Sequence, residues 1–349
     1  MITSDVGEER PDALRPFMVA EMSGNHQGSL ERALEIVRAA ARAGADAVKI
    51  QTYTADTITL DVDTPAFRVG EGHALWGSRR LYDLYVEAHT PWEWHADIFD
   101  LARELGLVAF SSPFDETAVE FLEGLGAPIY KIASLEIVDL PLIRQVAQTG
   151  KPVVMSMGTA TLVEVARAVE AAKGAGCEDL TLLVCTSSYP AIAADANVSR
   201  IPAVADMFDV KVGFSDHAPG VGVSAAAVAL GASLIEKHLT LDRADGGVDS
   251  DFSLEPAEFR MLVDSCRDAA AAIGRPSVWS TAAEAESKRL RPSLWITVPV
   301  KAGETVSPAN VRSVRPSGGL APVHIDRVMG RRFGVDAEPG TPLTWEVLS

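Results

Sequence analysis

The sequence predicts an α/β protein, a (β/α)8 TIM barrel followed by a small β-rich domain. From Phe17 to about Gly274, short apolar runs alternate with amphipathic segments that repeat their apolar residues at helical spacing. Eight such runs with helices between them, over about 250 residues, match the size of this barrel. A doubly wound open sheet is the competing layout, but the chain lacks the glycine-rich fingerprint of dinucleotide-binding sheets.

The eight apolar runs have the length of strands, and each is followed by polar residues. They are FMVA, AVKI, LVAF, IYKI, PVVMS, LTLLV, VKVGF and LIEK, and helices are expected at 29–44, 91–106, 117–126, 140–150 and 161–176. These helical segments end on glycine, a common helix stop. Ser29 is a suitable N-cap for the first helix, although Arg32 replaces the acid or amide of a full capping box.

Two further stretches depart from the strand–helix alternation. Residues 52–90 are long for a barrel connection, so they are either a lid or binding loop, or a surface excursion or subunit contact. After Gly274 the pattern changes to short β-like runs with Gly and Pro turns. We therefore expect a barrel domain at 1–275, a linker at 276–291 and a small domain at 292–349 that docks on the barrel or on a partner subunit.

Composition narrows the class of function. The chain has 349 residues and a net charge of −17, with 31 basic and 48 acidic side chains, which argues against binding to nucleic acid or to an anionic membrane. Three scattered cysteines make no disulfide framework. The polar N-terminus has no apolar signal core, and no run reaches membrane-spanning length, so we expect a cytoplasmic protein.

Polar side chains gather where the predicted strands end, which is where barrel enzymes place their active sites. In chain order they are Glu21, Lys49, Gln51, Ser111, Ser112, Lys131, Ser134, Glu136, Ser156, Thr186, Ser187, Ser188, Tyr189, Ser215, Asp216, His217, Glu236, Lys237 and His238. Any one of them alone is more often a solvated loop residue. Together they predict a single site.

The residue types suggest a division of tasks. His217 and His238 follow adjacent strands, so they could bind one divalent metal ion and leave positions open for water and substrate. Glu21 could act as a general base, Lys131 with several hydroxyls could hold a phosphate, and Lys49 could meet a carboxylate. The remaining histidines other than His26 are expected to be surface or packing residues: His73, His89, His95 and His324.

Several longer segments resemble the sialic acid synthase family. They include VAEMSGNHQGSLERALEIVRAAARAGADAVKIQTYTADTITL, FSSPFDETAVEFLE, YKIASLEIVDLPLI, CTSSYP, GFSDH and ALGASLIEKH, and the tail KAGETVSPANVRSVRPSGG is similar to the antifreeze-like (SAF) module that ends those enzymes. The resemblance covers nearly the whole chain from Phe17. It implies a metal-dependent, carbon–carbon bond-forming transferase, with Mn²⁺ favoured and Mg²⁺ or Co²⁺ as options, and a domain-swapped homodimer.

The resemblance also implies roles for individual residues. Glu21 would be the acid/base carboxylate, and His217 and His238 the metal ligands, so that the metal would polarise the aldehyde oxygen of a sugar. The implied substrate-binding residues are Lys49, Gln51, Ser112, Lys131, Ser134, Glu136, Ser156, Ser187, Tyr189, Ser215, Asp249 and Arg315, the last acting from the partner subunit. Sialic acid synthases commonly have Asn at the position of Ser187, which makes its phosphate contact less secure.

The implied reaction joins phosphoenolpyruvate to an acetamido sugar and releases phosphate. The segments IQTYTADTITL, LWGSRRLYDLYVEAHTPWEWHADIF and FSSPFD resemble the branch whose sugar is 2,4-diacetamido-2,4,6-trideoxy-altropyranose. The alternatives are the branches that make N-acetylneuraminic or legionaminic acid, a metal-dependent aldolase or another phosphoenolpyruvate-condensing synthase on the same barrel, and a barrel that has lost catalysis and only binds sugar.

Overall fold

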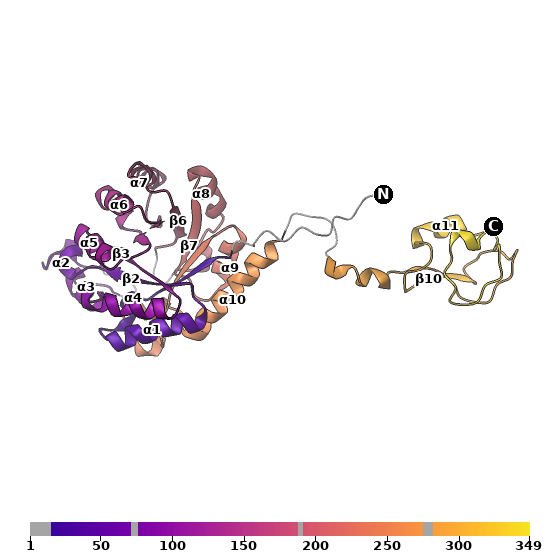
Figure 1. Cartoon of the computed structure of the whole chain (residues 1–349), viewed down its shortest axis with the longest axis horizontal. Helices are drawn as coiled ribbons and strands as arrows, with labels where there is room; N and C mark the ends of the chain where they lie inside the picture. Colours follow the sequence, from indigo (N-terminus) through magenta and orange to yellow (C-terminus); the bar gives the residue numbers. More distant parts are fainter. Residues whose placement is uncertain (1–14, 71–75, 188–190, 275–281) are drawn as a thin grey trace. The chain divides into compact units, whose positions relative to one another are not determined.

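The computed structural model describes residues 15–70, 76–187, 191–274 and 282–349. Contacts within the chain divide it into two compact units, one ending at Gly274 and one after it. In the first unit, eight parallel strands close into a barrel in sequence order, and helices surround it (Figure 1). The strands are β1 Phe17–Glu21, β2 Ala47–Thr52, β3 Val108–Pro113, β4 Tyr130–Ile132, β5 Val153–Ser156, β6 Leu180–Cys185, β7 Lys211–Asp216 and β8 Leu234–His238. The predicted barrel is confirmed.

The helices of this unit follow the strands closely. They are α1 Leu30–Ala43, α2 Ala55–Ile58, α3 Leu81–Ala88, α4 His95–Glu104, α5 Glu116–Gly124, α6 Leu140–Gln148, α7 Leu162–Gly174, α8 Arg200–Phe208, α9 Gly222–Ala229 and α10 Pro256–Ile273. The predicted N-cap of α1 is confirmed, because the Ser29 hydroxyl accepts a hydrogen bond from the Arg32 N–H at 3.2 Å. Helix α7 begins with a full capping box between Thr161 and Glu164.

The barrel has an apolar layer inside it and a larger apolar shell outside it. Alternate residues of a strand face opposite sides, so each strand contributes to both. Outward residues such as Met18, Val48 and Ile50 pack with helix residues such as Ile36 and Phe259. The inward layer consists of Val19, Ala47, Phe110, Val154, Leu183 and Leu234.

Two residues further along the same strands, the inward positions become polar. They are Glu21, Lys49, Ser112, Ser156, Cys185 and Glu236. The strand period of two therefore places a polar layer directly on the apolar one, toward the carboxyl end of the barrel. Within the described ranges, no helix is long and apolar enough to cross a membrane.

The second unit is small and has its own core. Strands β9 Ser293–Ile296 and β10 Val311–Val314 pair antiparallel, with Leu294 opposite Ser313, and α11 Ile325–Val328 follows. Its buried residues are Leu294, Ile296, Val300, Val306, Val311, Val328, Phe333, Leu343 and Leu348. The β-rich character predicted for this part of the chain agrees with these strands.

Candidate active site

Four buried charges of alternating sign form the floor of the site, which we call the charged floor: Glu21, Lys49, Glu236 and Lys131. The Lys49 ammonium lies 2.7 Å from a Glu21 carboxylate oxygen and 3.7 Å from Glu236. On the other side of Glu236, the Lys131 ammonium lies 3.9 Å away. Because all four are almost completely buried, each charge depends on its neighbours rather than on water.

Burial and neighbouring charges set the protonation of this floor. Burial raises the pKa of Glu21, against the attraction of Lys49. Burial would lower the pKa of Lys49, but Glu21 and Glu236 outweigh it and raise that pKa. The pKa of Glu236 is lowered, because Lys131 and Lys49 overcome the effect of burial, whereas burial lowers the pKa of Lys131. Glu21 is thus the member of the floor whose protonated form is favoured relative to an exposed carboxyl group.

Hydroxyl groups line the basic side of the floor. The Lys131 ammonium donates to the Ser156 hydroxyl at 2.7 Å, and Lys49 lies 3.5 Å from the Ser112 hydroxyl. The Ser215 hydroxyl donates to Glu236 at 2.9 Å. Ammonium and hydroxyl donors converging on one place suit an oxyanion of a phosphate or carboxylate.

A second pair of hydroxyls lies beside a glycine. The Ser187 hydroxyl donates to that of Ser134 at 3.1 Å. A Cβ atom on Gly158 would lie 2.3 Å from the Ser187 hydroxyl oxygen and 2.7 Å from both the Ser134 hydroxyl and the Cys185 sulfur. The absence of a side chain at Gly158 therefore lets these groups approach the backbone of the loop after β5.

The two predicted metal ligands lie side by side. His217 and His238 are buried with their ring centroids 5.4 Å apart, and Phe252 packs edge-on against both. Burial lowers the pKa of His217 to about 4, and burial and His217 lower that of His238, so both rings are neutral at neutral pH. Neutral imidazole is the form that binds metal ions.

A buried ion pair on the outer side of the barrel braces the turn that carries His217. Asp216 and Lys237, each the residue before a histidine, are opposite each other in register, and their charged groups lie 2.8 Å apart. The Asp216 carboxylate accepts from the Ala218 N–H at 2.9 Å, and Lys237 donates to the Ala218 carbonyl at 2.5 Å. The pair thus holds the peptide groups on the C-terminal side of His217.

A cavity of about 400 Å³ lies at the carboxyl end of the strands. Six of the predicted residues line it: Gln51, Ser134, Glu136, Ser187, His238 and Asp249. The Gln51 amide donates to Glu21 at 3.2 Å, which links the cavity to the charged floor. The volume suits a ligand of the size of a sugar.

Comparison with known proteins supports the predicted family. A profile of the NeuB family matches residues 36–277, and a profile of the SAF domain matches residues 291–349. The chain belongs to the NeuB family. The resemblance inferred from its motifs is confirmed, as is the prediction that it is an enzyme of that family.

Members of the NeuB family with curated functions match almost end to end. The chain is 42% identical to pseudaminic acid synthase of Campylobacter jejuni, over 94% of this chain and 95% of that protein. It is 39% identical to pseudaminic acid synthase of Helicobacter pylori, over 94% and 96%. It is 35% identical to N,N'-diacetyllegionaminic acid synthase of Legionella pneumophila, over 97% and 96%.

Solved structures agree with this fold. The N-acetylneuraminic acid synthetase of Leptospira borgpetersenii, crystallised with citrate, has a TM-score of 0.69 and 31% identity, over 78% of this chain and 90% of that one. The spore coat polysaccharide biosynthesis protein SpsE of Bacillus subtilis has a TM-score of 0.64 and 31% identity, over 96% and 95%.

The NeuB barrel brings most of the predicted site residues together, with two exceptions. Tyr189 lies outside the described residues. Arg315 follows β10 in the second unit, where its side chain is exposed. Of the histidines expected to pack or to lie at the surface, His95 is buried and contacts Phe121 edge-on, His89 and His324 are partly exposed, and His73 lies in a range that is not described.

Sequence reasoning gave no role to Glu236, which the structure places between both lysines of the floor. Its signal was available, because Glu236 stands two residues before His238 and so shares the inward face of β8. The sequence-based prediction also missed the apolar residues within 52–90 that line the cavity, because these residues follow no periodic pattern. The structure places Ser23 there as well.

The donors at the mouth of this NeuB barrel fit a divalent cation held by two nitrogen ligands. In the described part of the chain, His238 Nδ1 is buried without a hydrogen-bond partner, and no group of three or more His, Cys, Asp or Glu is arranged as a ligand set. His217 Nδ1 lies 3.2 Å from the Thr186 carbonyl, so the ring donates through that nitrogen and keeps the lone pair on Nε2. Oxygen atoms of water and substrate would complete the coordination.

Proposed function

We propose that the protein is a pseudaminic acid synthase. It would condense phosphoenolpyruvate with 2,4-diacetamido-2,4,6-trideoxy-altropyranose and release phosphate by cleavage of the C–O bond. The observation that carries this proposal is the identity of 39–42% to curated pseudaminic acid synthases over 94% of the chain. It is accompanied by a floor whose donors suit the anionic groups of phosphoenolpyruvate.

In the proposed complex, the basic side of the floor holds phosphoenolpyruvate. Lys131 with Ser156, Ser134 and Ser187 would bind the phosphate, and Lys49 with Ser112 would bind the carboxylate. Glu236 favours the charged form of both buried ammonium groups, because its carboxylate lies within 3.9 Å of each. Preorganised charges of this kind act strongly where water is excluded.

His217 and His238 would hold the metal ion, with Mn²⁺ favoured and Mg²⁺ or Co²⁺ as options. When bound, the cation would supply positive charge next to the carbonyl oxygen of the open-chain sugar. The chain itself would orient that sugar through Gln51 and Asp249. If either histidine is changed to alanine, activity and Mn²⁺ binding measured by calorimetry should both be lost, and an active His217→Ala protein would overturn this assignment.

The proposed reaction forms one carbon–carbon bond and breaks one carbon–oxygen bond. Carbon 3 of phosphoenolpyruvate forms a bond to the aldehyde carbon, whose oxygen would take a proton from Glu21, and carbon 2 becomes positively charged. Water adds to carbon 2 and gives up one proton, which Glu21 would accept. The C–O bond between carbon 2 and the phosphate then breaks, phosphate leaves with that oxygen and takes up the remaining proton of the added water, and the added oxygen becomes the keto group. A carboxyl group with a raised pKa suits this acid/base task.

A domain-swapped homodimer completes the proposal. The second unit would bring Arg315 to the site of the partner subunit, where its guanidinium would bind the substrate. The SAF profile covers the segment that contains Arg315, and its side chain is exposed in this structure. Exposure suits a side chain that meets its partner only in an assembly.

The second candidate function is synthesis of a related nonulosonic acid. Similarity to the legionaminic acid synthase of Legionella pneumophila at 35% identity supports it. The same floor would carry out the same chemistry on a different sugar. The two candidate functions differ only in the sugar, which would contact the walls of the cavity.

The experiment is a phosphate-release assay with phosphoenolpyruvate, Mn²⁺ and one of three sugars. They are the altrose sugar named above, its legionaminic counterpart and N-acetylmannosamine. We expect release with the altrose sugar alone. Release with another sugar would mean that the enzyme makes a different product by the same condensation. No release with any of the three sugars would contradict the proposed reaction.

A further inference from the structure

The connection between β2 and α4 forms an apolar side of the cavity, which we call the apolar wall. Its members are Ile58, Val69, Trp76, Leu81, Leu84 and Tyr85. Except for Leu84, which is buried, they are partly exposed. An apolar surface of this kind excludes water from one side of a bound ligand.

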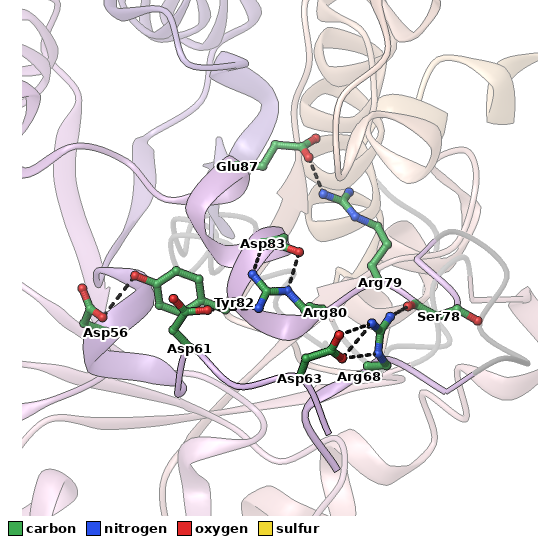
Figure 2. A network of polar contacts seen from close by, with 10 residues as sticks. All are labelled: Asp56, Asp61, Asp63, Arg68, Ser78, Arg79, Arg80, Tyr82, Asp83 and Glu87. Atoms are coloured by element: carbon green, nitrogen blue, oxygen red, sulfur yellow. Dashed lines mark hydrogen bonds and ion pairs between the residues drawn. The ribbon is translucent and has the colours of Figure 1, made fainter. Parts of the chain in front are cut away.

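Polar contacts on the outside of the same connection hold the wall in place (Figure 2). The Arg68 guanidinium makes a two-pronged contact with Asp63 at 2.7 and 2.9 Å and donates to the Ser78 carbonyl at 2.7 Å. Arg80 contacts Asp83 in the same two-pronged way and reaches Asp61 at 3.0 Å. Single exposed ion pairs contribute little, but this network joins both halves of the connection.

The wall is also tied to the barrel across the cavity. The Trp76 indole N–H donates to the Val248 carbonyl at 2.9 Å, beside Asp249. Tyr53 packs edge-on against Tyr85 and Phe114, with ring centroids 5.7 and 5.1 Å apart. These contacts join described residues of the wall to the barrel.

Two carboxyl groups line the same cavity, that of the buried Asp249 and that of the partly buried Glu136. Glu136 has one carboxylate oxygen without a hydrogen-bond partner in the described residues. Asp249 accepts a hydrogen bond from the Gly24 N–H at 3.2 Å and keeps further acceptor capacity. A ligand that satisfies both the wall and these groups carries methyl groups together with N–H or O–H donors.

We propose that the apolar wall selects the sugar by packing against its methyl groups, the deoxy carbon 6 in particular, while Glu136 and Asp249 accept hydrogen bonds from its amide and hydroxyl groups. This inference rests on the proposed function and names the part of the chain that sets its sugar specificity. A 6-hydroxyl group placed against the wall would lose its hydrogen bonds to water. Discrimination of this kind amounts to about 10- to 100-fold in kcat/KM.

The test compares two sugars that differ only at carbon 6, the 6-deoxy diacetamido altrose and its 6-hydroxy analogue. The variants Val69→Thr and Leu81→Asn put a polar group of similar size on the wall. Val62→Thr and Leu60→Asn are their matched controls, because both side chains are exposed in the same connection and neither lines the cavity. We expect at least one wall variant to reduce the preference for the 6-deoxy sugar about tenfold.

In that experiment the KM for phosphoenolpyruvate should stay the same in every variant, because the wall does not touch the charged floor. Equal preference in the wild type and in both wall variants would overturn the wall as the specificity element, while the proposed function would stand. A wild-type protein that releases no phosphate with any sugar would instead overturn the proposed function, and the inference with it. A cooperative thermal unfolding transition, measured for each variant, is the control that the variant is folded.

Discussion

Gly158 shows how much a single missing side chain matters in this site. The Ser134 and Ser187 hydroxyls and the Cys185 sulfur occupy the space that any Cβ at position 158 would need. Close approach of a backbone to a ligand-binding group is one of the uses of glycine. The position links the loop after β5 to the hydroxyls proposed to bind phosphate.

We predict that Gly158→Ala raises the KM for phosphoenolpyruvate about tenfold or more, because the new methyl group displaces those hydroxyls. Steady-state kinetics with phosphoenolpyruvate as the varied substrate measures this. Gly124→Ala in helix α5 is the matched control, since a Cβ there meets no atom within 4 Å. Equal KM values in both variants would show that the hydroxyls do not bind the phosphate.

His95 is a second informative residue, because it is buried away from the site. Its Nε2 lies 2.8 Å from the Thr52 hydroxyl and its Nδ1 lies 3.1 Å from the Pro91 carbonyl. Burial lowers its pKa from 6.5 to about 4. Between these values the unfolded chain binds more protons than the folded chain, so stability is complete above pH 6.5 and is lost as the pH falls toward 4.

We predict that lowering the pH from 7 to 5 reduces the free energy of unfolding by about 2 kcal/mol through His95 alone. The variant His95→Gln keeps hydrogen-bonding groups and does not titrate. Urea unfolding at both pH values should therefore show a smaller loss in the variant than in the wild type. Equal losses would mean that His95 is not buried in its neutral form.

At the scale of elements, β7 and β8 act as a unit. Their register sets Asp216 opposite Lys237, and each of these residues precedes one of the two histidines. Because consecutive strand residues face opposite sides, the ion pair lies among the outer helices while the histidines face the mouth. The pair also binds both polar groups of the Ala218 backbone.

We predict that Lys237→Met destabilises the protein by about 3–5 kcal/mol, because the buried Asp216 carboxylate keeps its hydrogen bonds from Ala218 and Ser224 but loses its positive partner. The double variant Asp216→Leu with Lys237→Met should recover much of that stability. It should not recover Mn²⁺ affinity or kcat, because the Ala218 backbone, next to His217, has lost its hydrogen bonds to both side chains. A stable double variant with full activity would show that the ion pair contributes to stability only and does not position His217.

The elements differ in how far the sequence predicts them. Strands β1 to β8 are apparent because each is a short apolar run, and their polar ends follow from the barrel geometry. The connection from Thr52 to Thr90 is not apparent in the same way. Its wall residues, such as Val69 and Leu81, have no common period, and their inward direction depends on arginine–carboxylate contacts that join residues up to 19 positions apart.

At the scale of the whole molecule, the two units have separate cores, and Arg315 belongs to the one outside the barrel. Motif resemblance predicted both units and their order. It could not predict which residues of one unit meet the other, because that depends on assembly and not on local pattern. The proposed exchange of the second unit between subunits is open to a direct test.

We predict that two inactive variants restore each other when mixed. Arg315→Ala and His217→Ala, unfolded together and refolded as mixed dimers, should regain about a quarter of wild-type activity, since half of the dimers are mixed and each has one complete site. Activity from refolding each variant alone provides the baseline. Failure to restore activity, with mixed dimers present, would contradict action of Arg315 in the partner's site.

The charged floor lies on the barrel strands and the apolar wall lies on a separate connection, and this has a consequence for how such enzymes diversify. The charged floor draws on four strands, β1, β2, β4 and β8, so most substitutions there would disturb the proposed catalysis. The wall belongs to one continuous stretch between β2 and α4 and has its own outer network. After gene duplication, substitutions confined to this connection could therefore change the sugar preference, while selection preserves the rest of the barrel.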